Sequence, residues 1–147
     1  LQAWKGVQWP GRLEIISSQP LIILDGAHNP HAVAPLVATM KERYGQLDKQ
    51  VLFTCIQTKA IEEMLELWSG LEKSQLTLTT FEDSRAYSTK EMQEIAHQKG
   101  LPYQEWKVFL THYLKRKSQQ SDLLLVTGSL YFLAQVRAFL IEEISRR

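Results

Sequence analysis

An acidic residue, a glycine and a histidine follow one strongly apolar run in this sequence. Residues 21–24 are all apolar, and Asp25 to His28 come directly after them. Such a run is typical of a strand that is buried on both faces, as in a parallel sheet covered by helices. Asn29-Pro30 then indicates a helix start, with proline at the first helical position. Because ligands of open α/β sheets bind beyond the carboxyl ends of the strands, Asp25 and His28 are candidate ligand-binding residues.

Each of these two side chains has a functional and a purely structural interpretation. The Asp25 carboxylate either accepts hydrogen bonds from a nucleotide's ribose or base, or orients a phosphate-binding cation, or only accepts backbone N–H bonds within its own turn. His28 either donates to a phosphate or carboxylate beside a helix N-terminus, where anions are favoured, or is a solvated surface residue. His31 is close to His28, but no carboxylate or cysteine cluster joins the pair, so we predict no metal site.

A second turn of similar design occurs near the end of the chain. Thr127-Gly128-Ser129 follows the apolar run 123–126 and precedes a helical pattern. Ser129 either caps that last helix or presents its hydroxyl and the neighbouring N–H groups to an anion in the same crevice.

The remaining pattern predicts the elements that position these two turns. Short strands are indicated at residues 13–16, 21–24, 51–56, 76–81 and 123–126. Helices are indicated from 30 to 44, after 60, from a capping box at Ser88 to Glu91, after Pro102, and after Ser129. For the last helix the predicted core face is Leu133, Val136, Leu140, Ile141 and Ile144. Alternating strands and helices predict an α/β fold: a three-layer, Rossmann-like domain with a mostly parallel sheet flanked by helices.

Composition narrows the class of protein. The 147 residues suit one domain, and 44% hydrophobic with 22% charged residues is ordinary for a globular protein. A net charge of +1 gives no reason to expect nucleic acid or an anionic membrane as a partner. The single cysteine, Cys55, has no partner for a disulfide, which favours a reducing, cytoplasmic setting. The absence of an initiator methionine suggests a piece of a longer protein, and no phosphate-binding glycine loop occurs, so any nucleotide phosphates would be held by another domain.

Three motifs, in this order and at these separations, resemble one known family. They are the run from Trp9 to Glu14, the run Leu24-Asp25-Gly26-Ala27-His28-Asn29-Pro30, and the run from Thr127 to Tyr131. Together they resemble the C-terminal domain of folylpolyglutamate synthase/dihydrofolate synthase, a branch of the Mur ligase superfamily. The chain departs from the family at residues 57–60, where relatives often carry an Asp-Lys-Asp run.

The resemblance implies a domain organisation and a reaction. Residues 1–12 would be an interdomain linker, and residues 13–147 a Mur-ligase-type C-terminal domain that closes over its own N-terminal P-loop ATPase domain. The reaction would be ATP-dependent amide formation through an acyl phosphate, with ATP, Mg²⁺, L-glutamate and a reduced folate or dihydropteroate as reactants. The protein would be a cytoplasmic monomer, and the isolated domain would be inactive.

The resemblance also implies roles for four residues. Arg12 and Asp25 match positions that bind the nucleotide, and His28 and Ser129 match positions on the side of the incoming glutamate. None of the four is an obvious general base or nucleophile, so we expect binding and positioning rather than bond making. Two alternatives stay open: a muramyl-type amino-acid ligase domain, and a non-catalytic α/β module that binds a nucleotide or a protein.

Overall fold

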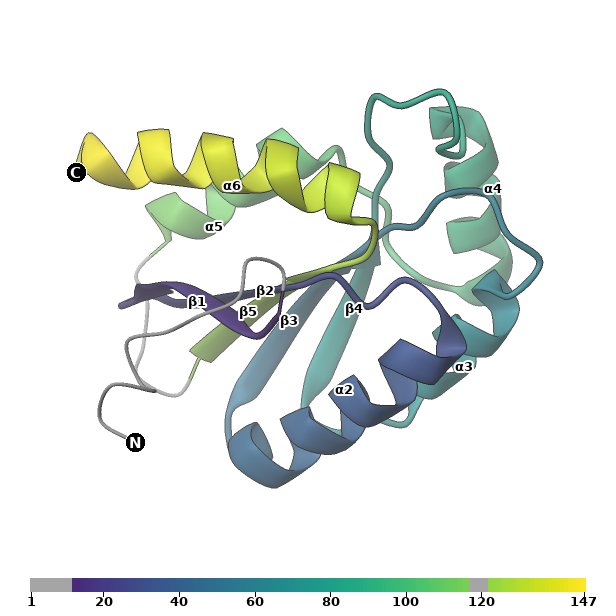
Figure 1. Ribbon diagram of the computed structural model, residues 1–147, viewed down its shortest axis with the longest axis horizontal. Coiled ribbons are helices and arrows are strands. Elements are labelled where there is room, and N and C mark those ends of the chain that lie inside the picture. The colour runs from purple at the N-terminus through teal and green to yellow at the C-terminus, as the bar shows by residue number, and fades with distance from the viewer. Residues whose placement is uncertain (1–11, 117–121) are drawn as a thin grey trace.

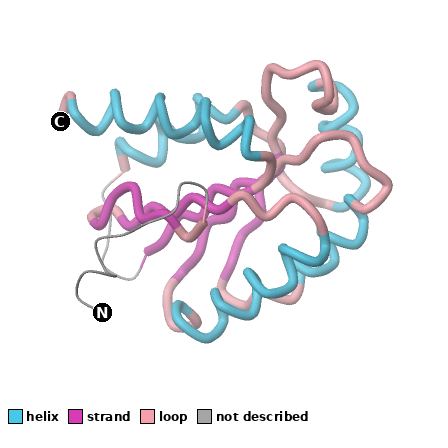
Figure 2. The backbone as a smooth tube through the Cα atoms, in the orientation of Figure 1, coloured by secondary structure: helices cyan, strands magenta, loops and turns pink. Residues whose placement is uncertain are grey.

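A single five-stranded sheet forms the centre of the described structure. The computed structural model describes residues 12–116 and 122–147, so most of the predicted linker, residues 1–11, lies outside it. The strands are β1 (Glu14–Ser18), β2 (Leu21–Asp25), β3 (Asp48–Phe53), β4 (Ser74–Leu78) and β5 (Asp122–Thr127). Their spatial order is β1-β2-β5-β3-β4, with β1 antiparallel to β2 and all other neighbours parallel. Figures 1 and 2 show this sheet between two layers of helices.

The helices divide unevenly between the two faces of the sheet. They are α2 (Pro30–Tyr44), α3 (Ile61–Ser69), α4 (Thr89–Lys99), α5 (Trp106–Lys115) and α6 (Leu130–Ser145). The first three share one hydrophobic cluster with the sheet, and α5 and α6 share the other (Figure 1). The predicted three-layer α/β fold with a mostly parallel sheet is therefore confirmed.

Alternation along the strands explains why both faces are covered. In β2, Ile23 joins the cluster under α2, whereas Ile22 and Leu24 join the cluster under α6, and all three are fully buried. Burying one such side chain contributes roughly 1.5–3 kcal/mol. A strand with no polar position in its middle is stable only between two apolar layers.

The arrangement creates a topological switch point beside Asp25. After β2 the chain enters α2 on one face, and after the neighbouring β5 it enters α6 on the other face. Asp25 and Thr127, the last residues of these two strands, are in register. Connections that leave adjacent strands toward opposite faces open a crevice at the carboxyl ends, where α/β proteins bind their ligands.

Most predicted helix ends are confirmed by their caps. Asn29 accepts a hydrogen bond from Ala32 N–H at 2.9 Å, and Pro30 is the first residue of α2. Ser88 and Glu91 form both bonds of the predicted capping box, and Gly100 ends α4 in the left-handed conformation.

Two strand predictions need correction. β3 covers residues 48–53 rather than 51–56, because Thr54 N–H turns to bond Thr127 O. β4 ends at Leu78 rather than extending to residue 81. Thr77 and Thr79 are buried where a wetter face was expected, because helices cover both faces of the sheet.

The core face of α6 is rotated from the predicted one. Ile141 is 45% exposed, and Phe132, absent from the predicted core, is fully buried. The Phe132 ring packs 5.5 Å from the ring of Phe81 and 6.0 Å from that of Trp106, measured between centroids. This aromatic contact sets the rotation of the helix.

Candidate functional site

The Asp25 carboxylate links two segments that are distant in sequence. Its Oδ1 accepts a hydrogen bond from Ala27 N–H at 2.9 Å, and its Oδ2 accepts one from Leu13 N–H at 3.0 Å. The first bond lies within the turn, as the structural interpretation of Asp25 supposes. The second joins the end of β2 to the residue that follows Arg12, so the carboxylate also fixes the segment leading into β1.

Leu13 holds an uncommon backbone conformation at this junction. Its φ is +46°, in the left-handed region that residues with a Cβ seldom adopt. Such a conformation persists only where the surroundings hold it, and the bond to Asp25 does so here. Arg12, exposed and adjacent, is thereby placed beside the carboxylate.

Opposing effects act on the Asp25 carboxyl group. Burial raises its pKa above the usual 3.8, while the N–H bonds from Leu13 and Ala27 and the charge of Arg12 lower it; burial is the largest effect. A partly desolvated carboxylate with two fixed donors has a defined orientation and unused acceptor capacity on both oxygens. That suits an acceptor for hydroxyl or amino groups of a ligand.

His28 lies on the exposed side of the same turn. Its Nδ1 is 2.9 Å from Gly26 O, and because a carbonyl only accepts, Nδ1 donates in this bond. The bond fixes the ring orientation and leaves Nε2 as the ring nitrogen available to a ligand.

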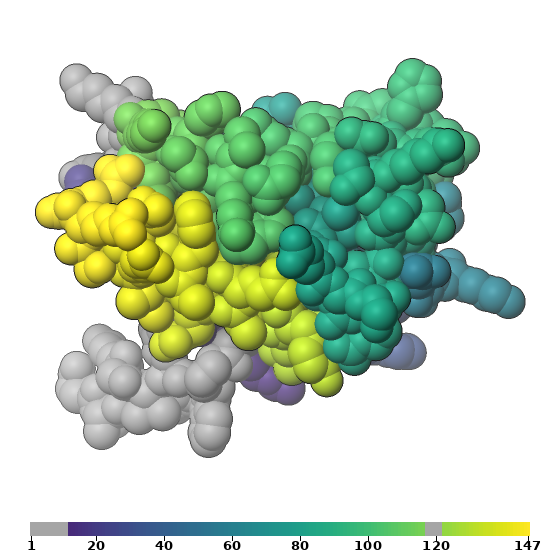
Figure 3. Space-filling view, turned by 90° about the horizontal axis from the view of Figure 1, so that it is seen from above, coloured from purple at the N-terminus to yellow at the C-terminus, as the bar shows by residue number. Residues whose placement is uncertain are grey.

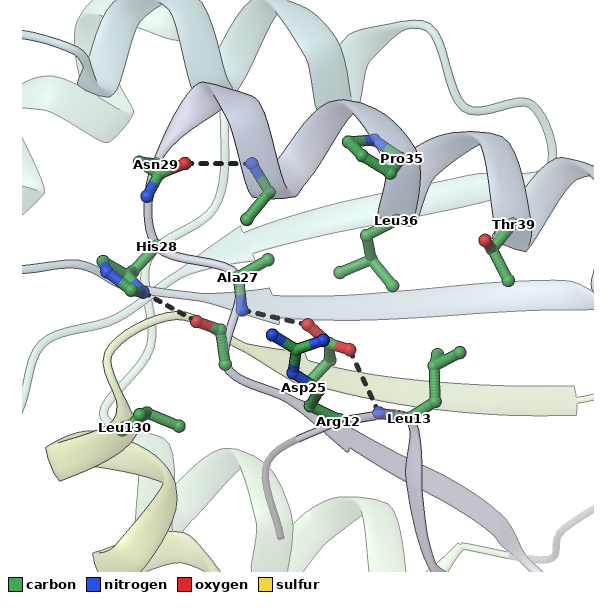
Figure 4. Close-up of a pocket in the computed structure, with 12 residues that line it drawn as sticks. Arg12, Leu13, Asp25, Ala27, His28, Asn29, Pro35, Leu36, Thr39 and Leu130 are labelled. Atoms are coloured by element: carbon green, nitrogen blue, oxygen red, sulfur yellow. Dashed lines mark hydrogen bonds between the residues drawn. The ribbon is translucent and has the colours of Figure 1, made fainter. Parts of the chain in front are cut away.

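One pocket of about 550 Å³ brings three of the four predicted site residues together. Arg12, Asp25 and His28 all line it, and Ser129 does not, although its neighbour Leu130 does (Figure 4). The remaining lining residues are Leu13, Gly26, Ala27, Asn29, Ala32, Pro35, Leu36 and Thr39. The α2 side of this pocket was not predicted. Pro35, an interior proline in a helical pattern, was the available sequence signal.

Backbone contacts join the two turns at the switch point. Gly128 N–H donates to Asp25 O at 3.3 Å, and Thr54 N–H donates to Thr127 O at 3.3 Å. Gly128 has φ +137°, and a Cβ there would overlap the carbonyl oxygen of Thr54. Only glycine fits this position.

Ser129 caps α6, as its structural interpretation predicted. Its Oγ accepts a hydrogen bond from Tyr131 N–H at 3.2 Å, and the residue is only 4% exposed. Its hydroxyl proton is not used in that bond, so Ser129 retains one donor at the start of α6.

An arginine absent from the predicted site lies over the same helix start. The Arg85 guanidinium is 4.0 Å from the centroid of the Tyr131 ring and makes two hydrogen bonds, at 2.8 and 2.9 Å, to the Asp83 carboxylate. Figure 3 shows this loop, in teal, against the beginning of α6. Arg85 gives a poor signal in the sequence, because Tyr131 is distant from it along the chain and only the fold brings the two together.

Comparison with known protein families decides the class of this domain. The model of the Mur ligase, glutamate ligase domain, matches residues 11–130. The chain belongs to this family. In this Mur ligase domain, the crevice between the ends of β2 and β5 is accordingly the candidate site for substrate contacts.

Individual relatives of this Mur ligase domain come from the folate branch. The chain is 29% identical over 129 residues to a dihydrofolate synthase/folylpolyglutamate synthase of Bacillus subtilis, covering 88% of this chain and 30% of the relative. A bifunctional folylpolyglutamate synthase/dihydrofolate synthase from Yersinia pestis, solved with AMPPNP and a Mn ion, superposes with a TM-score of 0.76 at 26% identity, covering 95% of this chain and 33% of that one. Another structure of such an enzyme contains Mn, AMPPNP and L-glutamate; it is 27% identical with a TM-score of 0.72, over 90% of this chain and 32% of that one. The chain thus spans about a third of these relatives.

Two further findings concern metal and membrane. Within the described residues, no group of three His, Cys, Asp or Glu side chains is placed to hold a metal ion. None of the described helices is both long and apolar enough to span a bilayer.

Proposed function

We propose that this chain is the C-terminal domain of an ATP-dependent ligase that adds L-glutamate to a folate, or to dihydropteroate, through an acyl phosphate. The observation that carries the proposal is the convergence of Arg12, Asp25 and His28 on one pocket at the switch point of a Mur ligase domain. The substrate class follows from the relatives, which are folate–glutamate ligases by name.

Arg12 and Asp25 are proposed to bind the nucleotide. Arg12 carries a permanent positive charge that stabilises phosphate, and it enters the pocket from the segment before β1. Asp25 offers its unused acceptor positions to ribose hydroxyls or to the base. Because the Asp25–Leu13 bond joins the two residues' segments, both contacts would form as one unit.

His28 and Ser129 are proposed to bind the incoming glutamate. His28 presents Nε2 from one turn, and Ser129 presents its hydroxyl from the other. The glutamate would lie across the crevice between β2 and β5. Neither residue is assigned a bond-making role; they position the amino group for attack on the acyl phosphate.

The phosphates and Mg²⁺ are assigned to an N-terminal P-loop domain preceding the linker of residues 1–12. The sequence has no phosphate-binding glycine loop, and the described residues offer no cluster of metal ligands. Closure of the two domains would exclude water from the acyl phosphate. We therefore propose that the 147-residue chain alone is inactive, that the whole protein is a cytoplasmic monomer, and that its partners are its own N-terminal domain and small substrates.

A substrate panel on the full-length protein tests the proposal. Release of phosphate from ATP should require L-glutamate together with a reduced folate or dihydropteroate, and a muramyl precursor with its amino acid should give none. Turnover with the muramyl precursor, or binding of ATP without any amide product, would replace the proposal by one of the alternatives. Isothermal calorimetry on the 147-residue chain should show weak or undetectable ATP binding.

A further inference from the structure

The outer edge of β4 is paired along only part of its length. Leu78 N–H donates to Pro102 O at 2.9 Å, and Leu78 O accepts from Gln104 N–H at 3.1 Å, so residues 102–104 extend the sheet. Thr79 N–H faces the other way, toward Phe53 O. Since alternate residues of a parallel strand direct both backbone groups to the same side, Leu76 must face outward as Leu78 does.

The chain itself explains why pairing stops at Leu76. Continuing the ladder by one step would require Pro102 N–H to bond Leu76 O, and proline has no N–H. The preceding residue is also engaged, because Leu101 N–H donates to Ala96 O at 2.8 Å in the cap of α4. Among the described residues, nothing bonds the backbone N–H or C=O of Leu76, so an open sheet edge is left there.

This open edge borders a groove of about 590 Å³ between β4, α3 and the end of α4. Its apolar lining residues are Leu65, Trp68, Leu71, Leu76 and Leu101. Trp68 Nε1 is buried without an acceptor among the described residues, so one hydrogen-bond donor of the groove residues is also unused.

The rim of the groove is negatively charged. Glu62, Glu63 and Glu66 line it together with a single cation, Lys99. Lys99 forms an ion pair with Glu62. Glu63 and Glu66 are exposed and make no ion pair with any described residue, so two carboxylates beside the groove are not neutralised.

We propose that this groove binds an extended, basic peptide segment of another protein, which adds to β4 as a short extra strand. The open backbone of Leu76 supplies strand pairing, the apolar floor accepts alternate side chains, and Glu63 and Glu66 select lysine or arginine. A second copy of this chain is a poorer occupant, because a symmetric contact would set the acidic rim against itself. Two strands, β3 and β5, separate β4 from the Asp25 pocket at the end of β2, so occupation of the groove is separate from the ligase chemistry.

Amide shifts of the isotopically labelled 147-residue chain test the proposal with defined probes. The basic probe is a capped pentapeptide of alternating valine and threonine flanked by lysines, and the acidic probe has glutamates in place of the lysines. The basic peptide should shift the amides of Ser74, Gln75 and Leu76 saturably, and the acidic peptide should not. The double substitution Glu63→Lys/Glu66→Lys should weaken binding by about tenfold, the scale of two lost charge contacts at a partly desolvated site.

Glu42→Lys provides the matched control, because Glu42 is an exposed carboxylate on α2 that lines neither the groove nor the Asp25 pocket. It should leave peptide affinity unchanged, and the dispersed amide spectrum of each variant verifies folding. Equal binding of both peptides, shifts confined to other elements, or no shifts at all would overturn the proposal. Concentration-dependent shifts of Leu76 without peptide would overturn it too, because they would show that a second copy occupies the edge instead.

Discussion

The carboxylate of Asp25 holds the backbone N–H of Leu13, twelve residues earlier in the chain, at 3.0 Å. This bond makes the residue at the tip of β2 responsible for the placement of Arg12. A substitution at Asp25 is therefore expected to act on two proposed nucleotide contacts at once.

Asp25→Ala should lower ATP-dependent glutamate addition by the full-length protein about tenfold or more, since it removes one ligand contact and releases Arg12. The same change should destabilise the domain by about 1–3 kcal/mol, because Leu13 and Ala27 N–H lose their acceptor. Steady-state turnover and urea denaturation measure the two effects. Asp48→Ala is the control, since the Asp48 side chain makes an exposed 4.0 Å ion pair with Lys73. Unchanged turnover in Asp25→Ala would count against the nucleotide role.

Acidification should favour the wild-type fold relative to Asp25→Asn. Burial raises the pKa of Asp25 above 3.8 in the folded state, so the folded state binds more protons than the unfolded state between 3.8 and the raised pKa. Lowering the pH through this window therefore adds stability through Asp25, and the asparagine variant lacks that contribution. Urea midpoints of both proteins from neutral pH to about pH 4 measure the difference. A wild-type stability that falls relative to the variant on acidification would contradict a raised pKa for Asp25.

His28→Ala and Ser129→Gly should each raise the KM for L-glutamate by about tenfold in the full-length protein while changing the KM for ATP little. Glycine is chosen at position 129 because it still permits the helix start, at a loss of only a few tenths of a kcal/mol. His112→Ala, on the exposed surface of α5, is the control. Parallel increases in both KM values would assign His28 and Ser129 to general site integrity instead of glutamate binding.

Gly128→Ala should destabilise the domain by about 3 kcal/mol or more, through overlap with Thr54 O and a strained φ. Gly100→Ala is a matched comparison: φ is +66° there and no atom lies within 4 Å of the added Cβ, so only the left-handed strain of about 1–2 kcal/mol applies. Denaturant midpoints rank the two variants. Equal losses would show that the contact between the β3 and β5 turns is not close in solution.

Cys55 should be inert toward thiol reagents in the folded protein. It is fully buried, and burial raises the pKa of its thiol to about 12, so the reactive thiolate is scarce at neutral pH. Titration with a chromogenic disulfide should detect no thiol in buffer and one per chain in urea, in agreement with the single cysteine. Rapid labelling in buffer would indicate that the end of β3 opens.

Local signals in the sequence were sufficient for the helices and for the turn after β2. The caps at Asn29 and Ser88 depend on neighbours within three residues, and both were predicted correctly. The pocket residues Arg12, Asp25 and His28 were predicted from motifs, and the structure brings them together. Their binding roles stay predictions.

Features that depend on distant contacts were not predictable in this way. The rotation of α6 follows from Phe132 packing against Phe81 and Trp106, which no periodicity in α6 reveals. Lys49, in a strand, is 2% exposed because its amine donates to three carbonyls after the end of α2, those of Tyr44, Gly45 and Leu47. Burial of a lysine could be anticipated only by knowing that these carbonyls would surround it.

The two clasps Gly128–Asp25 and Thr54–Thr127 consist of main-chain groups alone. Except at Gly128, the geometry of the crevice is consequently insensitive to which side chains it displays. A lineage of such domains can exchange the residues that select one amino acid for those that select another without rebuilding the turns. The same scaffold can in this way serve ligases of different specificity, with selectivity free to diverge while the architecture stays fixed.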